Sequence, residues 1–333
     1  MRAPGFWVGG GGGIAPLLLS PFSAIYAGAT ARRMARSGWR APLPVICCGN
    51  ATAGGAGKTT VALDLGRRLA ERGVASHFLL RGYGGSLKGP VRVDPISHDS
   101  TQVGDEALLL AEVRPTWIAA DRGAGGQAAV AAGAQAIVMD DGLQNPTLEK
   151  DLSLLVIDGG YGFGNGRVIP AGPLREPVAN AAARCQAAVL IGPDEAGALA
   201  QLPKDLTVLR ARLVAGPEAA ALAGQPVFAF CGIANPAKFF GTLQEAGAVL
   251  AGRESFADHY PYDDGDLQAL LAQADALRAV PVTTRKDFVR IPPAYRSRVT
   301  VISVALAWED PAAIESLLAP LAAQVPTLSL IHI

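Results

Sequence analysis

The segment from residue 45 to residue 60 constrains the fold more than any other part of the chain. A short apolar run ends in a glycine-rich turn, and Gly57-Lys58-Thr59 then opens a segment, 61–69, with the apolar spacing of a helix. Strand–loop–helix units of this kind bind phosphate, because glycines let successive backbone N–H groups surround an anion and the helix N-terminus adds its positive dipole end. The segment therefore predicts a nucleoside triphosphate site.

Two side chains of this loop have expected roles. Lys58 is expected to reach the β- and γ-phosphates, and the hydroxyl of Thr59 to complete the shell of a bound Mg²⁺. The loop departs from the usual pattern at Thr52, where a glycine normally stands. A glycine-rich turn that binds nothing is the competing interpretation, but it leaves the lysine without a packing role. The predicted nucleotide-binding residues are Thr52, Ala53, Gly54, Gly55, Ala56, Gly57, Lys58, Thr59 and Thr60.

The loop alone does not separate kinases, GTPases and ATPases of the partitioning type. Partitioning ATPases carry an additional lysine just before the glycine pair, and this chain has Ala53 there. GTPases need an Asn/Thr-Lys-x-Asp sequence to read guanine, and the nearest sequence here, Thr284-Arg285-Lys286-Asp287, has a different order. Both classes lose support, and a kinase is the remaining interpretation.

Composition sets the size of the core and excludes some partners. The chain has 333 residues, of which 50% are hydrophobic and 17% charged, so it can bury a large core, expected in two units. Its formal net charge is +0, whereas nucleic-acid-binding proteins usually present a basic face, so no nucleic-acid partner is expected. The four cysteines have no Cys-x-x-Cys spacing and are expected to be small buried side chains in a reducing compartment.

An apolar run near the N-terminus, residues 14–29, predicts contact with a membrane. As a helix it measures about 24 Å at about 1.5 Å per residue, short of a hydrocarbon core of about 30 Å, and Pro16 and Pro21 disfavour an uninterrupted span. A cleaved signal peptide is disfavoured, because export would separate the phosphate loop from cytosolic ATP. We expect a helix that lies in the membrane interface, with a helix packed on the protein's own core as the alternative. The arginines expected to meet anionic headgroups are Arg32, Arg33, Arg36 and Arg40.

The rest of the chain alternates apolar runs with helical patterns. This predicts an α/β fold with a mostly parallel sheet of the P-loop NTPase type, helices on both faces, and a smaller second α/β unit. The predicted divisions are a membrane-associated helical segment (1–40), a P-loop kinase core (41–215), a smaller α/β unit (216–326) and a tail without a readable pattern (327–333). The predicted strands are 43–48, 76–80, 116–120, 136–139, 152–157, 187–191 and an exposed one at 206–215, followed in the second unit by 227–231, 280–283 and 299–304.

Two adjacent acids close the predicted strand 136–139. An apolar strand that ends in Asp140 and Asp141 is typical of a Walker B element, which holds a carboxylate near the Mg²⁺–phosphate site. A helix cap or a turn is the competing interpretation. With a phosphate loop in the same predicted sheet, a metal site formed by Thr59 and at least one of the two acids is favoured.

Other polar residues also follow predicted strands or begin helices. Asp105 and Glu106 open a helix, and their spacing alone favours an interaction with the helix dipole over catalysis. Tyr83 and Arg122 lie in turns at the same end of the sheet as the phosphate loop. His259 stands among acidic and aromatic residues, where a lone histidine is more often structural unless the second unit closes over the nucleotide.

Taken together, the motifs resemble the tetraacyldisaccharide 4′-kinase family of Gram-negative bacteria, and the resemblance covers nearly the whole chain. Two positions depart from that family's pattern: Thr60 stands where it usually has proline, and Arg285 where it usually has glutamate, which leaves the role of the 284–287 loop open. The motifs are the N-terminal segment, 49–59, 81–84, 104–106, Asp121-Arg122, 140–144, 170–176, 232–236 and 258–260.

The resemblance implies an activity and residue roles. Members of this family transfer the γ-phosphate of ATP to the 4′-hydroxyl of a tetraacylated glucosamine disaccharide 1-phosphate, which gives lipid IVA. By position, Asp105 is implied as the base that accepts the hydroxyl proton, with His259 as its partner, and Lys58 as a phosphate ligand. The residues expected to contact the sugar and its anomeric phosphate are Tyr83, Arg122 and Arg175.

The resemblance also implies a location and leaves competing functions to be tested. A four-chain lipid stays in the bilayer, so a peripheral enzyme on the cytoplasmic face of the inner membrane is expected, with ATP and Mg²⁺ as cofactors. A membrane-associated partitioning-type ATPase would hydrolyse ATP without phosphorylating an acceptor. A kinase for a soluble sugar would explain the phosphate loop but not the N-terminal segment. A non-catalytic nucleotide-binding scaffold would keep its function without Asp105.

Overall fold

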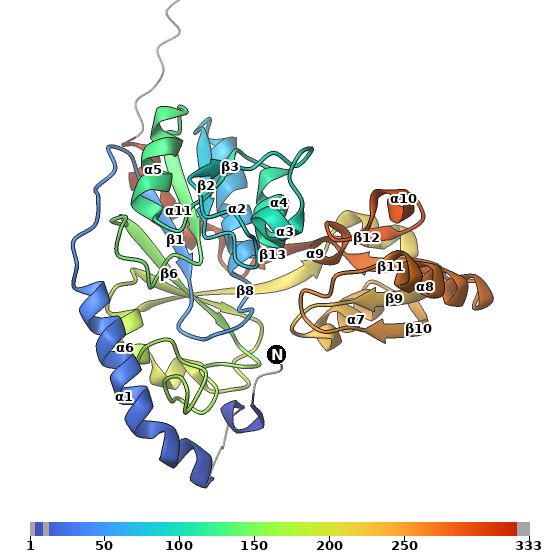
Figure 1. Cartoon of the computed structure of the whole chain (residues 1–333), viewed down its shortest axis with the longest axis horizontal. Coiled ribbons are helices and arrows are strands. Elements are labelled where there is room, and N and C mark those ends of the chain that lie inside the picture. The colour runs from blue at the N-terminus through green and yellow to red at the C-terminus, as the bar shows by residue number, and fades with distance from the viewer. Residues whose placement is uncertain (1–3, 9–12, 325–333) are drawn as a thin grey trace, which may run out of the picture.

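The computed structural model describes residues 4–8 and 13–324, which form a larger and a smaller α/β unit (Figure 1). All the strands predicted for the larger unit are present. β3 was not predicted, because two residues are too few to give a strand pattern. The strands of the larger unit are β1 (Val45–Gly49), β2 (Ser76–Leu80), β3 (Val91–Arg92), β4 (Thr116–Ile118), β5 (Ala136–Asp140), β6 (Leu152–Asp158), β7 (Ala187–Ile191), β8 (Thr207–Ala215) and β13 (Val304–Trp308).

These strands form one sheet in the order β13-β8-β7-β6-β1-β5-β2-β4-β3. Its pairs are parallel except at the two edges, where β3 runs antiparallel to β4 and β13 antiparallel to β8. The mostly parallel sheet predicted from the sequence is confirmed. Because the carboxyl ends of parallel strands meet at one edge, the loops after β1, β2 and β5 lie together there.

Helices cover both faces of this sheet. On β1, Ile46 and Cys48 are buried in one core, and Val45 and Cys47 in the core on the other side. Alternate side chains of a strand point to opposite faces, so a continuous apolar run such as this one is buried on both. The first core includes α2 (Lys58–Glu71), α4 (Asp105–Ala111) and α11 (Pro311–Ala322), and the second includes α5 (Arg122–Ala131) and α6 (Val178–Ala182).

The smaller unit has its own parallel sheet, in the order β10-β9-β11-β12. Its strands are β9 (Pro226–Cys231), β10 (Val249–Ser255), β11 (Val280–Thr284) and β12 (Thr300–Ile302). Helix α7 (Pro236–Glu245) packs on one face and α8 (Asp264–Ala276) on the other. The short helix α9 (Arg285–Phe288) follows β11 and lies between this sheet and the larger unit in Figure 1.

The predicted second unit, 216–326, differs from the structure at its C-terminal end. The predicted strand 299–304 is interrupted at Ser303, so that β12 stays in the smaller sheet while β13 returns to pair with β8 of the larger one. Leu306 and Trp308 are buried in the core of the larger unit, together with the apolar side of α11. The chain therefore crosses between the units twice. The predicted tail, 327–333, lies outside the described residues.

Helix α1 (Ile14–Met34) is longer than predicted. It has 21 residues and continues through Pro21, so its length is about 31 Å at about 1.5 Å per residue. The length of about 24 Å given from the sequence was that of the apolar run 14–29 alone, and the chain stays helical beyond it, past Arg32 and Arg33. Among the described residues, α1 is the one helix long and apolar enough to cross a membrane, judged by length and composition alone.

One face of α1 packs on the protein and another stays exposed. Pro16, Ser23 and Thr30, spaced seven residues apart, are buried. The hydroxyl of Ser23 donates to the carbonyl of Val168 at 2.7 Å and accepts from the amide of Ala171 at 3.1 Å. A helix with one docked and one apolar exposed face is compatible with peripheral membrane association. The exposed apolar side chains are Ile14, Leu17, Leu18, Phe22 and Ile25.

Candidate active site

The loop after β1 turns into α2 at Gly57, whose backbone has a φ of +85°. This left-handed conformation favours glycine, and a Cβ added there would also lie 2.6 Å from the Cδ1 of Ile191, whose side chain would have to shift. The next residue, Lys58, is only 9% exposed. Its ammonium donates to Oδ1 of Asn50 at 3.1 Å and to the carbonyl of Gly54 at 3.4 Å. These contacts hold the amine at the mouth of the loop.

Asn50 and Thr52 account for the unusual start of the loop. The Asn50 amide donates to the Thr52 hydroxyl at 3.0 Å and to the Gly54 carbonyl at 3.2 Å. Thr52 also forms a bridge with Leu174 of the neighbouring loop. The threonine therefore has a structural role inside the loop, in a position where glycine is more common.

The adjacent acids at the end of β5 lie in different surroundings. Asp140 accepts a hydrogen bond from the Thr59 hydroxyl at 2.7 Å through Oδ2, while its Oδ1 is buried without a hydrogen-bond partner. Burial outweighs the attraction of Lys58 and raises the pKa of Asp140 to about 7. Burial also acts to raise the pKa of Asp141, but Lys58 and Arg175 outweigh it and lower that pKa to about 2.

The surroundings of Asp140 fit a divalent cation. A buried carboxylate oxygen without a partner, next to a threonine hydroxyl at a phosphate loop, is a donor set of the hard oxygens that Mg²⁺ prefers. Within residues 4–8 and 13–324, no group of three or more His, Cys, Asp or Glu side chains forms a metal site. Mg²⁺ in kinase sites is usually held by one or two carboxylates together with substrate phosphates, so this finding is consistent with such a site.

Arg175 connects Asp141 to a buried polar chain. Its guanidinium donates to both oxygens of Asp141, at 2.7 and 3.0 Å, and to Oε1 of Gln144 at 3.3 Å. The amide of Gln144 donates in turn to the carbonyl of Asn50 at 2.9 Å and to Glu176 at 2.8 Å. Asp141 has a φ of +57°, a conformation that Asp tolerates better than most residues. The ion pair with Arg175 therefore holds Asp141 in this strained conformation, with its Oδ1 3.6 Å from the Lys58 ammonium.

Asp105 begins α4 directly after Gly104. Gly104 has a φ of +86°, and a Cβ there would lie 2.4 Å from the carbonyl oxygen of Tyr83. The glycine thus lets the loop that carries Tyr83 pack against the start of α4. Asp105 itself is 5% exposed, and its Oδ2 lies 2.8 Å from Nδ1 of His259, which comes from the smaller unit. The structure therefore brings together the two residues that the sequence analysis paired.

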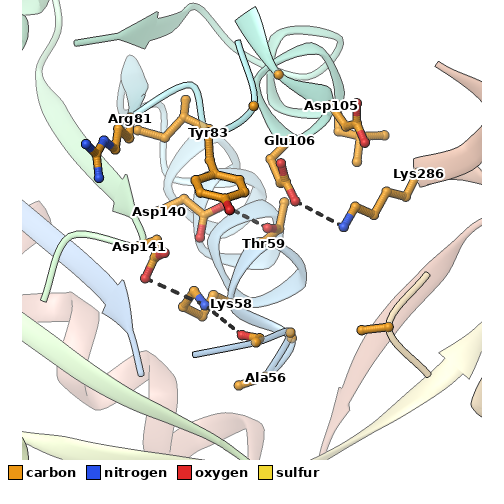
Figure 2. A pocket seen from close by; sticks show the side chains of 18 of the residues that line it. Ala56, Lys58, Thr59, Arg81, Tyr83, Asp105, Glu106, Asp140, Asp141 and Lys286 are labelled. Atoms are coloured by element: carbon orange, nitrogen blue, oxygen red, sulfur yellow. Dashed lines mark hydrogen bonds and ion pairs between the residues drawn. The ribbon is translucent and has the colours of Figure 1, made fainter. Parts of the chain in front are cut away.

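His259 lies among charged groups from both units. The Lys286 ammonium is 3.3 Å from His259 Nε2 and 3.1 Å from Oε1 of Glu106, which Figure 2 shows facing Lys286 across the pocket. When Nε2 accepts from Lys286, the proton of a neutral imidazole is on Nδ1, which donates it to Asp105. The hydrogen bond to Asp105 outweighs burial and raises the pKa of His259. The imidazole is therefore both oriented and made more basic by the contact across the two units.

The three predicted acceptor contacts differ in position. Tyr83 is 72% exposed and points into the pocket from the loop after β2 (Figure 2). Arg122 is 3% exposed, and its NH1 donates to the carbonyls of Ala119 and Ala120 at 2.6 and 3.3 Å. Burial lowers the pKa of Arg122 to about 10. Arg175 forms a bidentate ion pair with Asp141, so it lies on the phosphate-loop side of the cleft.

One cleft between the two units, with a volume of about 1630 Å³, is lined by Lys58, Thr59, Tyr83, Asp105, Arg122, Asp140, Asp141, Arg175 and His259. The phosphate loop and Asp140 form one end, and the Asp105–His259 pair belongs to the same cavity. The C-terminal half of α1, through Tyr26 and Arg33, and Arg36 just after the helix also border it. The N-terminal helix and the nucleotide loop therefore open onto a common space.

Sequence reasoning did not assign three charged residues of this cleft. Glu106 was attributed to the helix dipole, and the role of Lys286 was left open with the 284–287 loop. Arg290, whose Nε lies 3.2 Å from Oδ2 of Asp105, was not considered at all. Only the short distances between the two units reveal these contacts, because nothing in the sequence indicates how the units close.

A phosphate-binding loop that shares a cleft with a carboxylate–histidine pair, on a mostly parallel sheet, is the arrangement of a P-loop phosphotransferase. Comparison with known proteins narrows this class. Residues 15–322 match the family described as "Tetraacyldisaccharide-1-P 4'-kinase". The chain belongs to this family.

Similar proteins cover nearly its whole length. A "Tetraacyldisaccharide 4'-kinase" of Gluconacetobacter diazotrophicus is 58% identical over 318 residues, which are 96% of this chain and 97% of that protein. The protein of the same name from Rhodospirillum rubrum is 54% identical over 323 residues, with the same coverage of both chains. A crystal structure of LpxK from Aquifex aeolicus in complex with ATP has a TM-score of 0.74 at 24% identity, and covers 92% of this chain and 99% of that one. The similarity to the Aquifex aeolicus structure supports the fold.

Proposed function

We propose that this chain uses ATP to phosphorylate the 4′-hydroxyl of a tetraacyl glucosamine disaccharide 1-phosphate, and that Asp105 and His259 activate that hydroxyl. Family membership makes the chain an ATP-dependent kinase of lipid A biosynthesis. The observation that supports the residue assignment is the contact of 2.8 Å between Asp105 and His259, formed across the cleft that also holds the phosphate loop.

The proposed transfer begins with the acceptor hydroxyl against the free oxygen of Asp105. Oδ2 of Asp105 is in contact with His259, so Oδ1 is the oxygen available to take the hydroxyl proton. As the hydroxyl oxygen bonds to the γ-phosphorus, the bond from that phosphorus to the β–γ bridging oxygen breaks and ADP leaves. The proton stays on the pair of Asp105 and His259 until solvent removes it. Positioned bases of this kind contribute about 10²- to 10⁴-fold to rate.

Lys58, Thr59 and Asp140 form the proposed site for the triphosphate and its metal. The Lys58 ammonium would offset charge on the β- and γ-phosphates, and the backbone amides of the loop would bind their oxygens. Asp140 and Thr59 would hold Mg²⁺, which supplies further neutralisation of the phosphate charge when bound. Asp141 serves a different purpose in this proposal, because it is already paired with Lys58 and Arg175.

The acceptor is proposed to lie along Tyr83 and Arg122. Tyr83 is exposed enough to pack against a sugar ring, and Arg122 supplies positive charge at the same end of the sheet. Arg175 was predicted as a third acceptor contact, but its bidentate pair with Asp141 favours a role beside the phosphates. We therefore assign its charge to the nucleotide end of the cleft.

The acceptor's acyl chains give α1 a proposed role. Its exposed apolar side chains would enter the acyl boundary of the cytoplasmic leaflet, with the arginines at its C-terminal end near the headgroups. Because Tyr26, Arg33 and Arg36 also border the cleft, a lipid in that leaflet could reach the site along α1. This arrangement supports the proposed peripheral position on the cytoplasmic face of the inner membrane.

The decisive experiment is transfer of labelled γ-phosphate from ATP to a tetraacyl disaccharide 1-phosphate in mixed micelles, with wild type and Asp105→Ala compared. We expect labelled lipid from the wild type and a rate lower by about 10²-fold or more in the variant. Similar rates would keep the substrate and reject Asp105 as the base. Hydrolysis of ATP without labelled lipid would favour the partitioning-type ATPase.

A further inference from the structure

Arg290 is a buried cation in direct contact with the proposed base. It follows α9 by two residues in the smaller unit, and its side chain is only 3% exposed. Its Nε donates to the carbonyl of Lys286 at 3.4 Å and forms an ion pair at 3.2 Å with Oδ2 of Asp105, the same oxygen that contacts Nδ1 of His259. No described residue makes a hydrogen bond to the other oxygen of Asp105, Oδ1.

The rest of the guanidinium holds the backbone around His259. NH1 donates to the carbonyl of Tyr260 at 2.9 Å, and NH2 donates to the carbonyl of Gly232 at 3.1 Å. The backbone amide of His259 donates to that same Gly232 carbonyl at 3.1 Å. His259 has a φ of +60°, which costs free energy for a residue with a side chain and persists only when its neighbours fix it.

Asp287 fixes Arg290 in turn. It is fully buried, and its Oδ1 accepts from NH2 of Arg290 at 2.8 Å, from the amide of Gly232 at 2.7 Å and from the hydroxyl of Tyr262 at 2.9 Å. A buried charge pair with this many hydrogen bonds has one well-defined geometry. The position of the guanidinium is therefore set by the smaller unit, independently of Asp105.

We propose that Arg290 is a positioning residue for the Asp105–His259 pair. Its guanidinium forms an ion pair with Oδ2 of Asp105, which leaves Oδ1 turned to the acceptor hydroxyl. Its two terminal nitrogens hold the carbonyl of Tyr260, next to His259, and the carbonyl of Gly232, which also accepts from the His259 amide. The base site is then complete only when the smaller unit lies against α4. This inference rests on the proposed function, because it assigns Arg290 to the reaction in which Asp105 accepts a proton.

The charge of Arg290 also has a predicted effect on pH dependence. A cation beside the pair favours the unprotonated form, which is the form that can accept a proton. Without that cation, the pair holds its proton more tightly, so the acidic limb of the kcat profile moves to higher pH. The charged groups that face His259 are Asp105 at 2.8 Å, Lys286 at 3.3 Å, Asp258 at 3.7 Å and Glu106 at 4.0 Å, with Arg290 acting through Asp105.

The test compares Arg290→Gln and Arg290→Lys with Arg285→Gln in the full-length protein, by phosphorylation of the tetraacyl disaccharide 1-phosphate in mixed micelles. Arg285 also bridges the two units, to Glu112 at 2.6 Å, but has no contact with Asp105. We expect Arg290→Gln to lower kcat by about 10- to 100-fold with the KM for ATP within about twofold. Arg290→Lys keeps the charge but not the fork of donors, so it should recover part of kcat and most of the pH profile. Arg285→Gln should change kcat by less than about fivefold and leave the pH profile in place.

Several outcomes would overturn the proposal. The first is a kcat of Arg290→Gln within about twofold of the wild-type kcat. The second is a fall in kcat of Arg285→Gln that equals that of Arg290→Gln in size and in pH dependence, because closure of the two units would then explain the whole loss of activity. If Arg290→Gln does not fold, as judged by circular dichroism, Arg290→Lys decides: a folded Lys variant with wild-type kcat rejects the positioning role. Absence of labelled lipid from the wild type would instead refute the proposed function.

Discussion

Asp140 and Asp141 are neighbours in the sequence but occupy opposite electrostatic environments. The sequence analysis placed both at a metal site without choosing between them. The structure gives Asp141 two cationic partners, Lys58 and Arg175, and leaves one oxygen of Asp140 buried and unpaired beside Thr59. An unpaired buried carboxylate oxygen costs free energy that a bound cation would recover. This difference favours Asp140 as the protein's carboxylate ligand to Mg²⁺.

A pair of matched substitutions tests that choice. Asp140→Asn is expected to raise the Mg²⁺ concentration required for half-maximal phosphorylation by about 10-fold or more. Loss of a residue that only hydrogen-bonds to a metal ligand already lowers metal affinity by about 10-fold or more, and loss of a ligand itself should have at least that effect. Asp141→Asn should change the Mg²⁺ requirement less and instead raise the KM for ATP, because it releases Lys58 and Arg175 from their common partner. Mg²⁺ titrations of both variants at saturating ATP provide the measurement. Equal shifts in the Mg²⁺ requirement would contradict the assignment.

Local motifs indicated many residues of the cleft, whereas contacts between distant segments could not be predicted. The Gly57-Lys58-Thr59 loop and the acids after β5 are readable because each depends on a single strand end. The pairing of Asp105 with His259 joins residues 154 positions apart, and it was inferred from the family resemblance alone. Spacing by itself had favoured a dipole role for Asp105. Arg290 has no such motif, so its contact with Asp105 appears only in three dimensions.

At the scale of elements, α1 has both features that the sequence analysis treated as alternatives, a face packed on the protein and an exposed apolar face. The face of α1 that packs on the protein carries Ser23, which forms hydrogen bonds with the loop at residues 167–171. Another face of the helix is apolar and exposed. Removing the whole segment would also remove support from the loop that leads to Arg175. Substitutions on the exposed face are therefore a sharper test of membrane binding than a deletion.

Replacing Leu17, Leu18 and Phe22 together with glutamine should weaken partitioning to anionic vesicles by about 10-fold or more. Each buried methylene contributes about 0.8 kcal/mol, and about 1.4 kcal/mol corresponds to tenfold. Glutamine keeps the helix, since its propensity is close to that of leucine. Vesicle sedimentation measures the partitioning, and the affinity for ATP should not change.

The matched control for this triple variant is Ala24→Gln with Ala29→Gln. Both alanines are exposed on α1, so this variant adds the same polar group while it removes little apolar surface. It should partition nearly as the wild type does. If the triple variant also partitions as the wild type does, the exposed face of α1 does not bind the membrane.

For the whole molecule, the sequence predicted two α/β units but not how they are connected. β13 and α11 return to the larger unit because Leu306, Trp308 and the apolar side of α11 complete its core. A pattern of short apolar runs does not indicate which sheet a strand joins, and the break at Ser303 is a single residue. The double crossover holds the smaller unit close to α4, where α9 presents Arg285, Lys286 and, just beyond it, Arg290.

Arg285 departs from the usual glutamate of the family, and the structure gives that departure a local explanation. Its guanidinium donates twice to Oε2 of Glu112 on the larger unit, at 2.9 and 2.6 Å. Arg285→Glu would place two carboxylates there and oppose closure of the cleft. Because the pair is exposed, we expect a fall in kcat/KM for lipid phosphorylation of only about two- to fivefold at low salt. The fall should largely disappear at about 1 M salt, where the Debye length is about 3 Å.

Charge reversal separates this contact from a general effect of charge. Adding Glu112→Arg to Arg285→Glu restores opposite charges across the two units, so kcat/KM should return toward the wild-type value. Arg298→Glu is the control, because Arg298 pairs at 3.2 Å with Asp275 inside the smaller unit and cannot affect closure. A loss that persists in the double variant and at high salt would mean that residue 285 acts on the site by another route. Recovery would show that electrostatic contacts between the units set how often the Asp105–His259 pair is assembled.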